Sequence, residues 1–256
     1  MAENLIKISN LTKTYGGVKA LNSLDMVIEK NKIHGIVGPN GAGKTTLINI
    51  ITGLECPTSG EIFFQGQKIN KAPPEIIFEM GITRTFQEGK IVPNLTVLEN
   101  IIIGFLKKKE QENYNIVSIF SGLAKYFQQK QKDIKKGKDL LKKFDLQYLA
   151  DKWADDLAWN EIQLVQIVRA IASDPLFLLL DEPTAGMNEK EKIIIKEKMF
   201  EINRSGVTIL LVSHDIPFIK SVVDNLTVLN FGEKISEGPV AQVLADPKVW
   251  EVYLGS

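Results

Sequence analysis

The segment GPNGAGKT, residues 38–45, constrains the fold of this chain more than any other. It follows an apolar, β-branched run at Ile33–Val37 and precedes a stretch with the apolar spacing of a helix. The segment fits the pattern G-x-x-x-x-G-K-[ST], in which backbone N–H groups point toward one place beside the positive end of a helix, and that arrangement suits a phosphate group. A glycine-rich turn that only joins a strand to a helix is the alternative. The complete match in this setting favours phosphate binding.

Short apolar runs alternate with longer helical patterns along the chain. IHGIV, LFLLL and VTILLVS, at residues 33–37, 176–180 and 207–213, are nearly continuous runs of apolar residues. Parallel strands have this character because helices cover both faces of their sheet. We therefore expect an α/β fold, a P-loop NTPase core in which a parallel sheet is flanked by helices.

Two other parts of the chain have different patterns. The first 30 residues and LTVLNFGEKISEG, residues 226–238, alternate apolar with polar letters around turn-forming Gly and Asn, which indicates antiparallel strands beside the core. From about residue 93 to 154 the chain is helical in pattern and rich in lysine, which indicates a helical insertion. We expect one domain over 1–256, with the core and an N-terminal antiparallel β subdomain at about 1–92 and 165–256, and an inserted α-helical subdomain at about 93–164.

Composition limits the kinds of partner. The 31 basic residues balance the 31 acidic ones, so no global field favours nucleic acid, and no nucleic-acid partner is expected. Cys56 is the only cysteine, which excludes an internal disulfide, and the first residues lack the layout of a secretory signal. The apolar runs are shorter than the roughly 18 residues that span a bilayer. The expectation is a cytoplasmic protein.

A second segment is suited to hold a metal ion. The run LFLLL ends in Asp181, followed by Glu182 and by Pro183, which stops the strand. Asp181 is expected to hold Mg²⁺ from the side opposite the Thr45 hydroxyl, and Glu182 to orient or deprotonate an attacking water. An acidic pair exposed to solvent at a strand end is the alternative, and the phosphate loop in the same chain argues against it.

Four further side chains are weak signals when taken alone. His214 follows the run at 207–213, at the strand end where open α/β sheets bind ligands, and could donate to a terminal phosphate. Gln87, in a loop after a short strand, would by itself be a surface glutamine. Tyr15, before a glycine pair, would by itself be a packing aromatic, although it could stack on a base. His34 precedes the phosphate loop, and we expect it to pack rather than to react.

In this order, along essentially the whole chain, these residues resemble the ATP-binding cassette family, the nucleotide-binding subunits of ABC transporters. The resemblance implies that Tyr15 stacks on adenine and that Gln87 contacts Mg²⁺ and the transmembrane subunit. It also implies that Asp181 and Glu182 are the second nucleotide motif and the catalytic glutamate, and that His214 is the switch histidine.

The expected site residues fall into three groups. The catalytic group is Glu182, His214 and Lys44, and the group that holds Mg²⁺ is Thr45, Gln87 and Asp181. The residues expected to bind ATP are Tyr15, Gly38, Pro39, Asn40, Gly41, Ala42, Gly43, Lys44, Thr45, Thr46 and Gln87.

The resemblance also implies partners. Two cassettes, copies of this chain or a pair of different chains, would bind head to tail and hold ATP between the phosphate loop of one and the signature segment of the other. Transmembrane permease subunits would hold them at the inner face of the cell membrane, and an extracytoplasmic solute-binding protein would act indirectly.

The segment LAWNEIQ, residues 157–163, occupies the signature position, which usually reads L-S-G-G-Q or a close variant. The expected signature residues are Leu157, Ala158, Trp159, Asn160 and Glu161. Ala158 lacks the usual serine hydroxyl, and Asn160 replaces a glycine that would allow close approach and positive φ. We expect a weakened composite site. The alternative is that this segment only starts a helix.

Other segments resemble the branched-chain amino-acid uptake branch of the family: RTFQEGKIVPNLTVLENIIIG, AGMN at residues 185–188 and the closing VYLG. Three alternatives remain open at this stage. They are a cassette with weak or partner-dependent hydrolysis that regulates another, a soluble cassette ATPase without a transport role, and a small-molecule kinase. The order of Gln87, Asp181 and His214 argues against the kinase.

Overall fold

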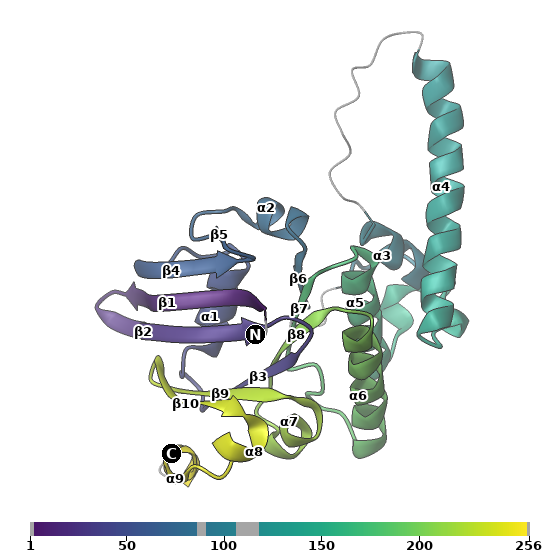
Figure 1. Cartoon of the computed structure of the whole chain (residues 1–256). Coiled ribbons are helices and arrows are strands. Elements are labelled where there is room, and N and C mark those ends of the chain that lie inside the picture. Colours follow the sequence, from purple (N-terminus) through teal and green to yellow (C-terminus); the bar gives the residue numbers. More distant parts are fainter. Residues whose placement is uncertain (1–2, 86–90, 106–117, 255–256) are drawn as a thin grey trace. The chain divides into compact units, whose positions relative to one another are not determined.

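The computed structural model describes residues 3–85, 91–105 and 118–254 of the chain (Figure 1). They belong to two compact units, one formed by residues 1–87 and 176–256 and the other by residues 88–175. The subdomain limits expected from the sequence, 93 and 164, stay a prediction.

A six-stranded sheet forms the centre of the first unit. Its strands, in spatial order, are β10 (Glu233–Pro239), β9 (Asn225–Asn230), β3 (Ile33–Val37), β8 (Thr208–Val212), β7 (Phe177–Asp181) and β6 (Ile82–Arg84). The pairs from β9 to β6 are all parallel, and every residue of β3, β7 and β8 is buried. The expected parallel core, with nearly continuous apolar strands, is confirmed.

The expectation for residues 226–238 is partly wrong. β9 pairs in parallel with β3, with His34 opposite Asn225 and Val37 opposite Val228, and only β10 is antiparallel. Thr227 is one of the polar residues in that alternating pattern, but it is fully buried and its hydroxyl lies 2.8 Å from His34 Nε2. A buried hydrogen-bonded threonine thus produced a false alternation in the sequence.

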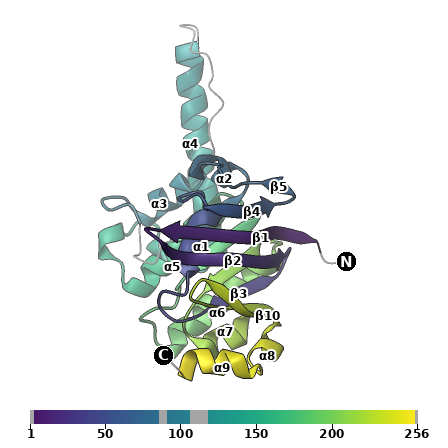
Figure 2. The ribbon, with the colours of Figure 1, turned by 90° about the vertical axis from the view of Figure 1, so that its left-hand side faces the viewer.

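The N-terminal antiparallel subdomain is confirmed. Its sheet has the order β2 (Val18–Glu29), β1 (Asn4–Tyr15), β4 (Ser59–Phe64) and β5 (Gln67–Lys68), and every pair is antiparallel. β1 and β2 run side by side across the front of Figure 2. β1, β2 and β4 supply one face of the apolar core of the unit.

Helix α1 (Lys44–Ile51) joins the two sheets of this unit. Its residues Leu47, Ile48, Ile50 and Ile51 are buried in one apolar cluster with Ile8 of β1, Phe177 of β7 and Leu210 of β8. Burial of such a side chain contributes about 1.5–3 kcal/mol. The helix that follows the phosphate loop is therefore held rigidly against both sheets.

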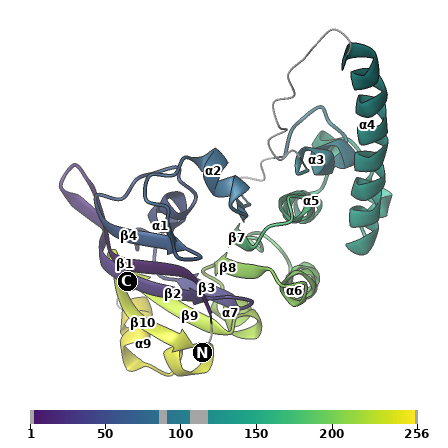
Figure 3. The same ribbon diagram turned by 45° about the horizontal axis from the view of Figure 1, so that its top comes forward.

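The other helices of the first unit are α2 (Pro74–Glu79), α6 (Glu189–Arg204), α7 (Ile216–Val222), α8 (Val240–Val243) and α9 (Pro247–Leu254). α6 lies against β8 and α7, as Figure 3 shows. It begins at a capping box, in which the Asn188 side chain accepts from the N–H of Glu191 and Glu191 accepts from the N–H of Asn188.

The second unit is helical, as expected. It contains α3 (Val97–Ile103), α4 (Ser118–Lys143), two short 3₁₀ helices at Gln147–Leu149 and Ala154–Asp156, and α5 (Trp159–Ala172). α3 packs on both α4 and α5. The approach of α3 to α4 is close at Gly137, where an added Cβ would lie 2.7 Å from Leu98 Cδ1.

Within the described ranges, no helix combines the length and the apolar character needed to cross a bilayer.

Candidate nucleotide-binding site

The register of the central sheet brings three loops to one edge. Val212 of β8 lies opposite Ile36 of β3 and opposite Asp181 of β7. Because these strands are parallel, their carboxyl ends meet at the same edge of the sheet, where α/β folds bind ligands. The phosphate loop, the Asp181–Glu182 pair and His214 therefore emerge next to one another.

The phosphate loop has the backbone that its glycines predict. Gly41 and Gly43 have φ of 80° and 98°, a region that favours glycine. A Cβ on Gly43 would lie 2.4 Å from the carbonyl oxygen of Ala20, and one on Gly38 would lie 2.2 Å from that of Leu229. Residues of two hairpins thus press against the loop, so it cannot widen to admit larger side chains.

The first turn of α1 has no side-chain cap. Gly43 is its N-cap residue, and Thr45 and Thr46 follow in the first turn. Thr45 is exposed and Thr46 is half-buried. Uncapped N–H groups at a helix start attract anions, because the helix dipole is positive there. The local geometry matches a phosphate site.

The side chain of Lys44, the first residue of α1, reaches back to the start of the loop. Its ammonium group donates to the carbonyl oxygens of Gly38 and Pro39, at 2.6 Å and 2.9 Å. Partial burial lowers the pKa of Lys44, and the negative charges of Glu182 and Asp181 oppose that shift. Both carboxylates are therefore within electrostatic reach of the ammonium group.

The acidic pair is buried rather than solvated. Asp181 is 5% exposed and Glu182 is 8% exposed. Asp181 Oδ2 accepts a hydrogen bond from Arg84 at 2.8 Å. Glu182 has a φ of 50°, unusual for a non-glycine residue, and its N–H donates to the carbonyl oxygen of Val212 at 2.9 Å. Strain of this kind is often retained at functional sites.

His214 contacts Glu182 directly. Its Nδ1 lies 2.9 Å from Glu182 Oε1, and its side chain is 74% exposed. The next residue, Asp215, caps α7 by accepting from the N–H of Phe218 and forms an ion pair with Lys192 of α6 at 2.6 Å. Burial tends to raise the pKa of Asp215, but the hydrogen bonds from Lys192 and Phe218 hold it below its usual value. The histidine is thus exposed on a firmly anchored segment.

Tyr15 is held at the end of β1 by a polar cluster. It is 44% exposed, its hydroxyl donates to Glu55, and the ammonium group of Lys13 lies 4.9 Å from its ring centroid. Partial burial and the hydrogen bond to Glu55 raise the pKa of Tyr15, while the Thr46 hydroxyl acts in the opposite sense. The neutral ring is partly accessible beside the first turn of α1, as stacking on a base requires.

His34 has the packing role expected for it. It is 1% exposed, and burial lowers its pKa to about 4. The neutral ring shares a hydrogen bond with Thr227 below the phosphate loop.

The residues expected to hold Mg²⁺ have suitable chemistry. Magnesium prefers oxygen ligands, which the Thr45 hydroxyl and the Asp181 carboxylate provide. Arg84 occupies Oδ2 of Asp181, and Oδ1 takes no hydrogen bond from the described part of the chain. One carboxylate oxygen is thus left for a metal ion or a water bound to it. Gln87, the third expected ligand, lies outside the described residues.

The signature segment starts a helix in the second unit. Ala158 is the N-cap of α5, and its N–H donates to Glu161 Oε2 at 3.0 Å. This is one of the two hydrogen bonds of a capping box, and the other is missing because alanine has no hydroxyl to accept from the N–H of Glu161. Leu157 is buried, while Trp159 is 41% exposed. Asn160 lies in the first helical turn and has no positive φ. The backbone at this position therefore does not require the glycine that usually stands there. The Asn160 side chain adds bulk and an amide group where a glycine would have neither.

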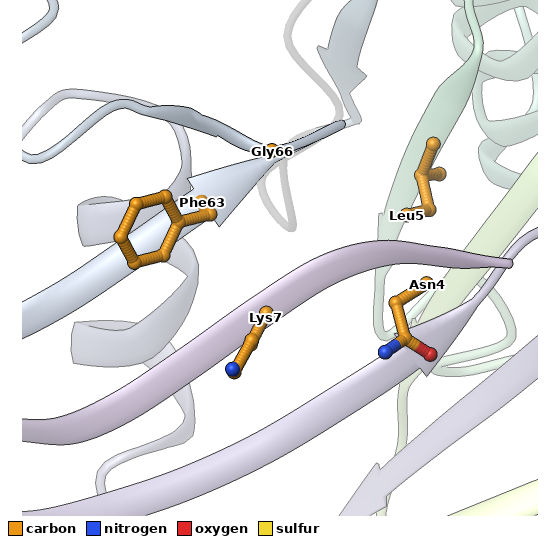
Figure 4. A pocket seen from close by; sticks show the side chains of 5 residues that line it. All are labelled: Asn4, Leu5, Lys7, Phe63 and Gly66. Atoms are coloured by element: carbon orange, nitrogen blue, oxygen red, sulfur yellow. The ribbon is translucent and has the colours of Figure 1, made fainter.

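A shallow cavity of about 280 Å³ lies elsewhere, on the antiparallel sheet (Figure 4). Asn4, Leu5, Lys7, Phe63 and Gly66 line it. It shares no residue with the phosphate loop, the acidic pair or the His214 segment.

Sequence reasoning missed three polar residues of the site. Asn49 on α1, Glu55 after α1 and Arg84 at the end of β6 connect Tyr15 to Asp181 through hydrogen bonds. A charged residue inside a buried strand, as at Arg84, and an amide on an apolar helix, as at Asn49, were the available signals.

Comparison with known proteins places this geometry in a family. Residues 21–185 match the family model described as ABC transporter. The probable branched-chain amino acid transport ATP-binding protein LivG of Archaeoglobus fulgidus is 34% identical over 98% of this chain and 96% of its own. The high-affinity branched-chain amino acid transport ATP-binding protein LivG of Escherichia coli K12 is 32% identical over 100% of this chain and 99% of its own.

Solved structures agree. A nucleotide-free ATP-binding cassette from an ABC transporter superposes with a TM-score of 0.84 at 31% identity, covering 99% of this chain and 100% of its own. The ADP conformation of an ATP-binding cassette gives 0.82 at 30% identity, covering 99% of each chain. The fold, the loop at the sheet edge and these likenesses together show that the chain belongs to the ABC transporter family, as one of its ATP-binding cassette ATPases.

Proposed function

We propose that this chain binds MgATP at the edge of the central sheet and hydrolyses it to drive a membrane importer. The observation that carries the proposal is the convergence of Lys44, Asp181 and the Glu182–His214 pair on the phosphate loop. Its relatives are named for branched-chain amino acid transport, which supports branched-chain amino acids or related small polar solutes as the cargo.

The loop and α1 are proposed to hold the triphosphate. Backbone N–H groups of residues 40–46 and the ammonium group of Lys44 bind its β- and γ-phosphates. Lys44 exchanges its present acceptors, the carbonyl oxygens of Gly38 and Pro39, for phosphate oxygens. The exposed face of Tyr15 stacks on adenine. Thr45 and Asp181, with Gln87, hold Mg²⁺, which supplies neutralisation of the phosphate charge.

Glu182 is proposed to orient the attacking water and to accept its proton. A general base of this kind contributes about 10²- to 10⁴-fold in rate. The hydrogen bond from His214 fixes Oε1 of the carboxylate and leaves Oε2 for the water. The burial of Glu182 strengthens both interactions, because charge interactions are weakly screened in a low dielectric.

The signature segment is proposed to act on the nucleotide of a second cassette, bound head to tail. The start of α5 offers backbone N–H groups to phosphate, but Ala158 adds no hydroxyl donor. A hydrogen bond to a charged group is worth roughly 1.5–3 kcal/mol, so the composite site is weaker by about that amount. Permease subunits at the inner face of the membrane, and through them a solute-binding protein, complete the proposed assembly.

Single-turnover ATP hydrolysis by the purified full chain tests the proposal. Glu182→Gln is expected to abolish turnover while it keeps ATP binding and accumulates an ATP-bound dimer in size-exclusion chromatography. Glu189→Gln, at an exposed acid of α6, is the matched control and should behave as the wild type. Equal turnover of Glu182→Gln and the wild type would remove the role given to this carboxylate.

A second candidate function is a cassette that hydrolyses ATP poorly and regulates another. Ala158 and the bulk of Asn160 favour it, because both weaken the composite site. Mixing the chain with a second ATP-binding cassette separates the two functions. A motor turns over ATP alone, whereas a regulatory cassette shows turnover only in the mixture, and only from the partner's site.

A further inference from the structure

A continuous chain of hydrogen bonds connects the residue proposed to stack on adenine with a residue proposed to hold Mg²⁺. It begins at Tyr15, passes through Glu55, Asn49 and Arg84, and ends at Asp181. Its members come from β1, the turn after α1, α1 itself, β6 and β7. None of the three inner residues belongs to the phosphate loop at residues 38–45, so their proposed part in the site is indirect.

Arg84 is fixed at two points. One guanidinium nitrogen donates to Asn49 Oδ1 and the other donates to Asp181 Oδ2, both at 2.8 Å. The side chains of Arg84 and Asp181 are only 9% and 6% exposed. Because the guanidinium group is planar, two such contacts set the direction from which it meets the carboxylate.

The side-chain amide of Asn49 cannot flip without losing its hydrogen bonds. Its Nδ2 donates to Glu55 Oε1 at 2.9 Å, while its Oδ1 accepts from Arg84. A flipped amide would place an NH₂ group against the guanidinium and an oxygen against the carboxylate. Burial tends to raise the pKa of Glu55, but hydrogen bonds from Tyr15, Asn49 and Lys13 hold it below the usual value, so Glu55 stays an acceptor. The orientation of Arg84 is therefore set from α1.

The same contact orients Asp181. With Oδ2 held by Arg84, the carboxylate plane is fixed, and Oδ1 takes no hydrogen bond from the described residues. Asp181 ends β7, at the same edge of the sheet from which the phosphate loop emerges. A buried ion pair is weak evidence for stability alone, because desolvation offsets much of its attraction. Its geometry is better suited to aligning a metal ligand.

We propose that Arg84 and Asn49 are positioning residues that align Asp181 for Mg²⁺, with Arg84 holding one carboxylate oxygen so that the other meets the metal shell. This inference rests on the proposed function. Loss of this alignment should lower the affinity for Mg²⁺. It should leave phosphate binding by the loop unchanged, because neither Arg84 nor Asn49 belongs to the loop.

The test measures binding of a fluorescent ATP analogue to the full chain, first in EDTA and then during a Mg²⁺ titration. Arg84→Gln should keep the affinity in EDTA within about twofold and raise the Mg²⁺ concentration for half-maximal effect about tenfold, since loss of an outer-shell partner typically costs 10- to 100-fold in metal affinity. Arg84→Lys keeps the positive charge but loses the planar guanidinium group with its two donor nitrogens. Arg84→Lys and Asn49→Leu should each raise the Mg²⁺ concentration for half-maximal effect, but less than Arg84→Gln does.

A double-mutant cycle separates positioning from general stability. In an Asp181→Asn background, Arg84→Gln should change the Mg²⁺ requirement less than twofold further, because its target is already altered. Ile62→Ala, at a buried position of β4 in the antiparallel sheet, is the control for destabilisation and should leave the Mg²⁺ requirement unchanged. Thermal unfolding identifies any variant that does not fold, and Arg84→Lys then carries the test.

An unchanged Mg²⁺ requirement in Arg84→Gln or Arg84→Lys would overturn the inference. So would an equal loss of affinity with and without metal, or full additivity with Asp181→Asn. A wild-type chain that binds no nucleotide at all overturns the proposed function itself, and that outcome is recognised before any variant is made.

Discussion

His214 Nδ1 lies 2.9 Å from Glu182 Oε1, although 32 positions separate the two residues in the chain. The contact joins the ends of β7 and β8, and it links an exposed ring to a buried carboxylate. It lies at the edge of the sheet from which the phosphate loop emerges, so it can be tested directly by its effect on ATP turnover.

His214→Ala should lower turnover with little change in KM for ATP. The carboxylate loses the donor that orients it, and a hydrogen bond to a charged group is worth roughly 1.5–3 kcal/mol, which corresponds to about 10- to 150-fold in rate. His214→Gln retains a donor and should recover part of the rate. Steady-state kinetics of the three proteins decides the matter, and turnover of His214→Ala equal to the wild type would contradict the role.

His34 should make the stability of the chain depend on pH. Burial lowers its native pKa to about 4, below the usual value of 6.5, so the unfolded chain takes up a proton first as the pH falls. Stability from this residue is complete above pH 6.5 and is lost toward pH 4, by about 3 kcal/mol in total.

Chemical denaturation of the wild type and of His34→Gln, between pH 7 and pH 4, measures this loss. The glutamine can keep a hydrogen bond with Thr227 but does not titrate, so its curve should fall less steeply. Parallel curves for the two proteins would show that His34 does not carry the pH dependence.

Gly43→Ala should destabilise the fold as well as the nucleotide site. The position has a φ of 98°, and an added Cβ would lie 2.4 Å from the Ala20 carbonyl oxygen. Gly66, with a φ of 78° and open space around it, is the matched control for the backbone penalty alone. We expect Gly43→Ala to cost about 1–3 kcal/mol more than Gly66→Ala in the free energy of unfolding. Equal losses of unfolding free energy in the two variants would mean that the backbone at Ala20 moves to make room for the added methyl group.

Ala158→Ser should have two effects. The hydroxyl completes the capping box of α5, which raises the free energy of unfolding by about 1 kcal/mol, and it adds a donor for the nucleotide of the second cassette. ATP-dependent dimerisation, followed by analytical ultracentrifugation, should strengthen about tenfold. Ala158→Thr and Ala158→Val differ only by the hydroxyl and isolate its contribution. If both strengthen the dimer alike, the hydroxyl is not the cause.

The local part of the site could be predicted from the sequence. An apolar run predicts the bounds of β3 at Ile33 and Val37. Glycine spacing and a helical pattern directly after it predict the loop and the presence of α1. Strand propensity, glycine conformation and helical periodicity each depend on residues that are close in the chain, so they can be recognised in a single sequence.

The long-range part could not be predicted. Arg84 and Asp181 are 97 positions apart, and their pairing depends on β6 and β7 being neighbours in the sheet. Thr227 gives residues 226–238 an alternating pattern because it is polar, yet it is buried against His34 in a strand that pairs in parallel with β3. Strand order and buried polar partners arise from the whole fold, which local patterns do not contain.

Equilibrium binding of ATP to the purified chain, with and without Mg²⁺, tests the central claim most directly. The wild type should bind one nucleotide in the range of about 1 μM to 1 mM that is typical of enzyme substrates, and Lys44→Ala should bind it far more weakly. A wild-type chain with no affinity for adenine nucleotide at any metal concentration would contradict the account.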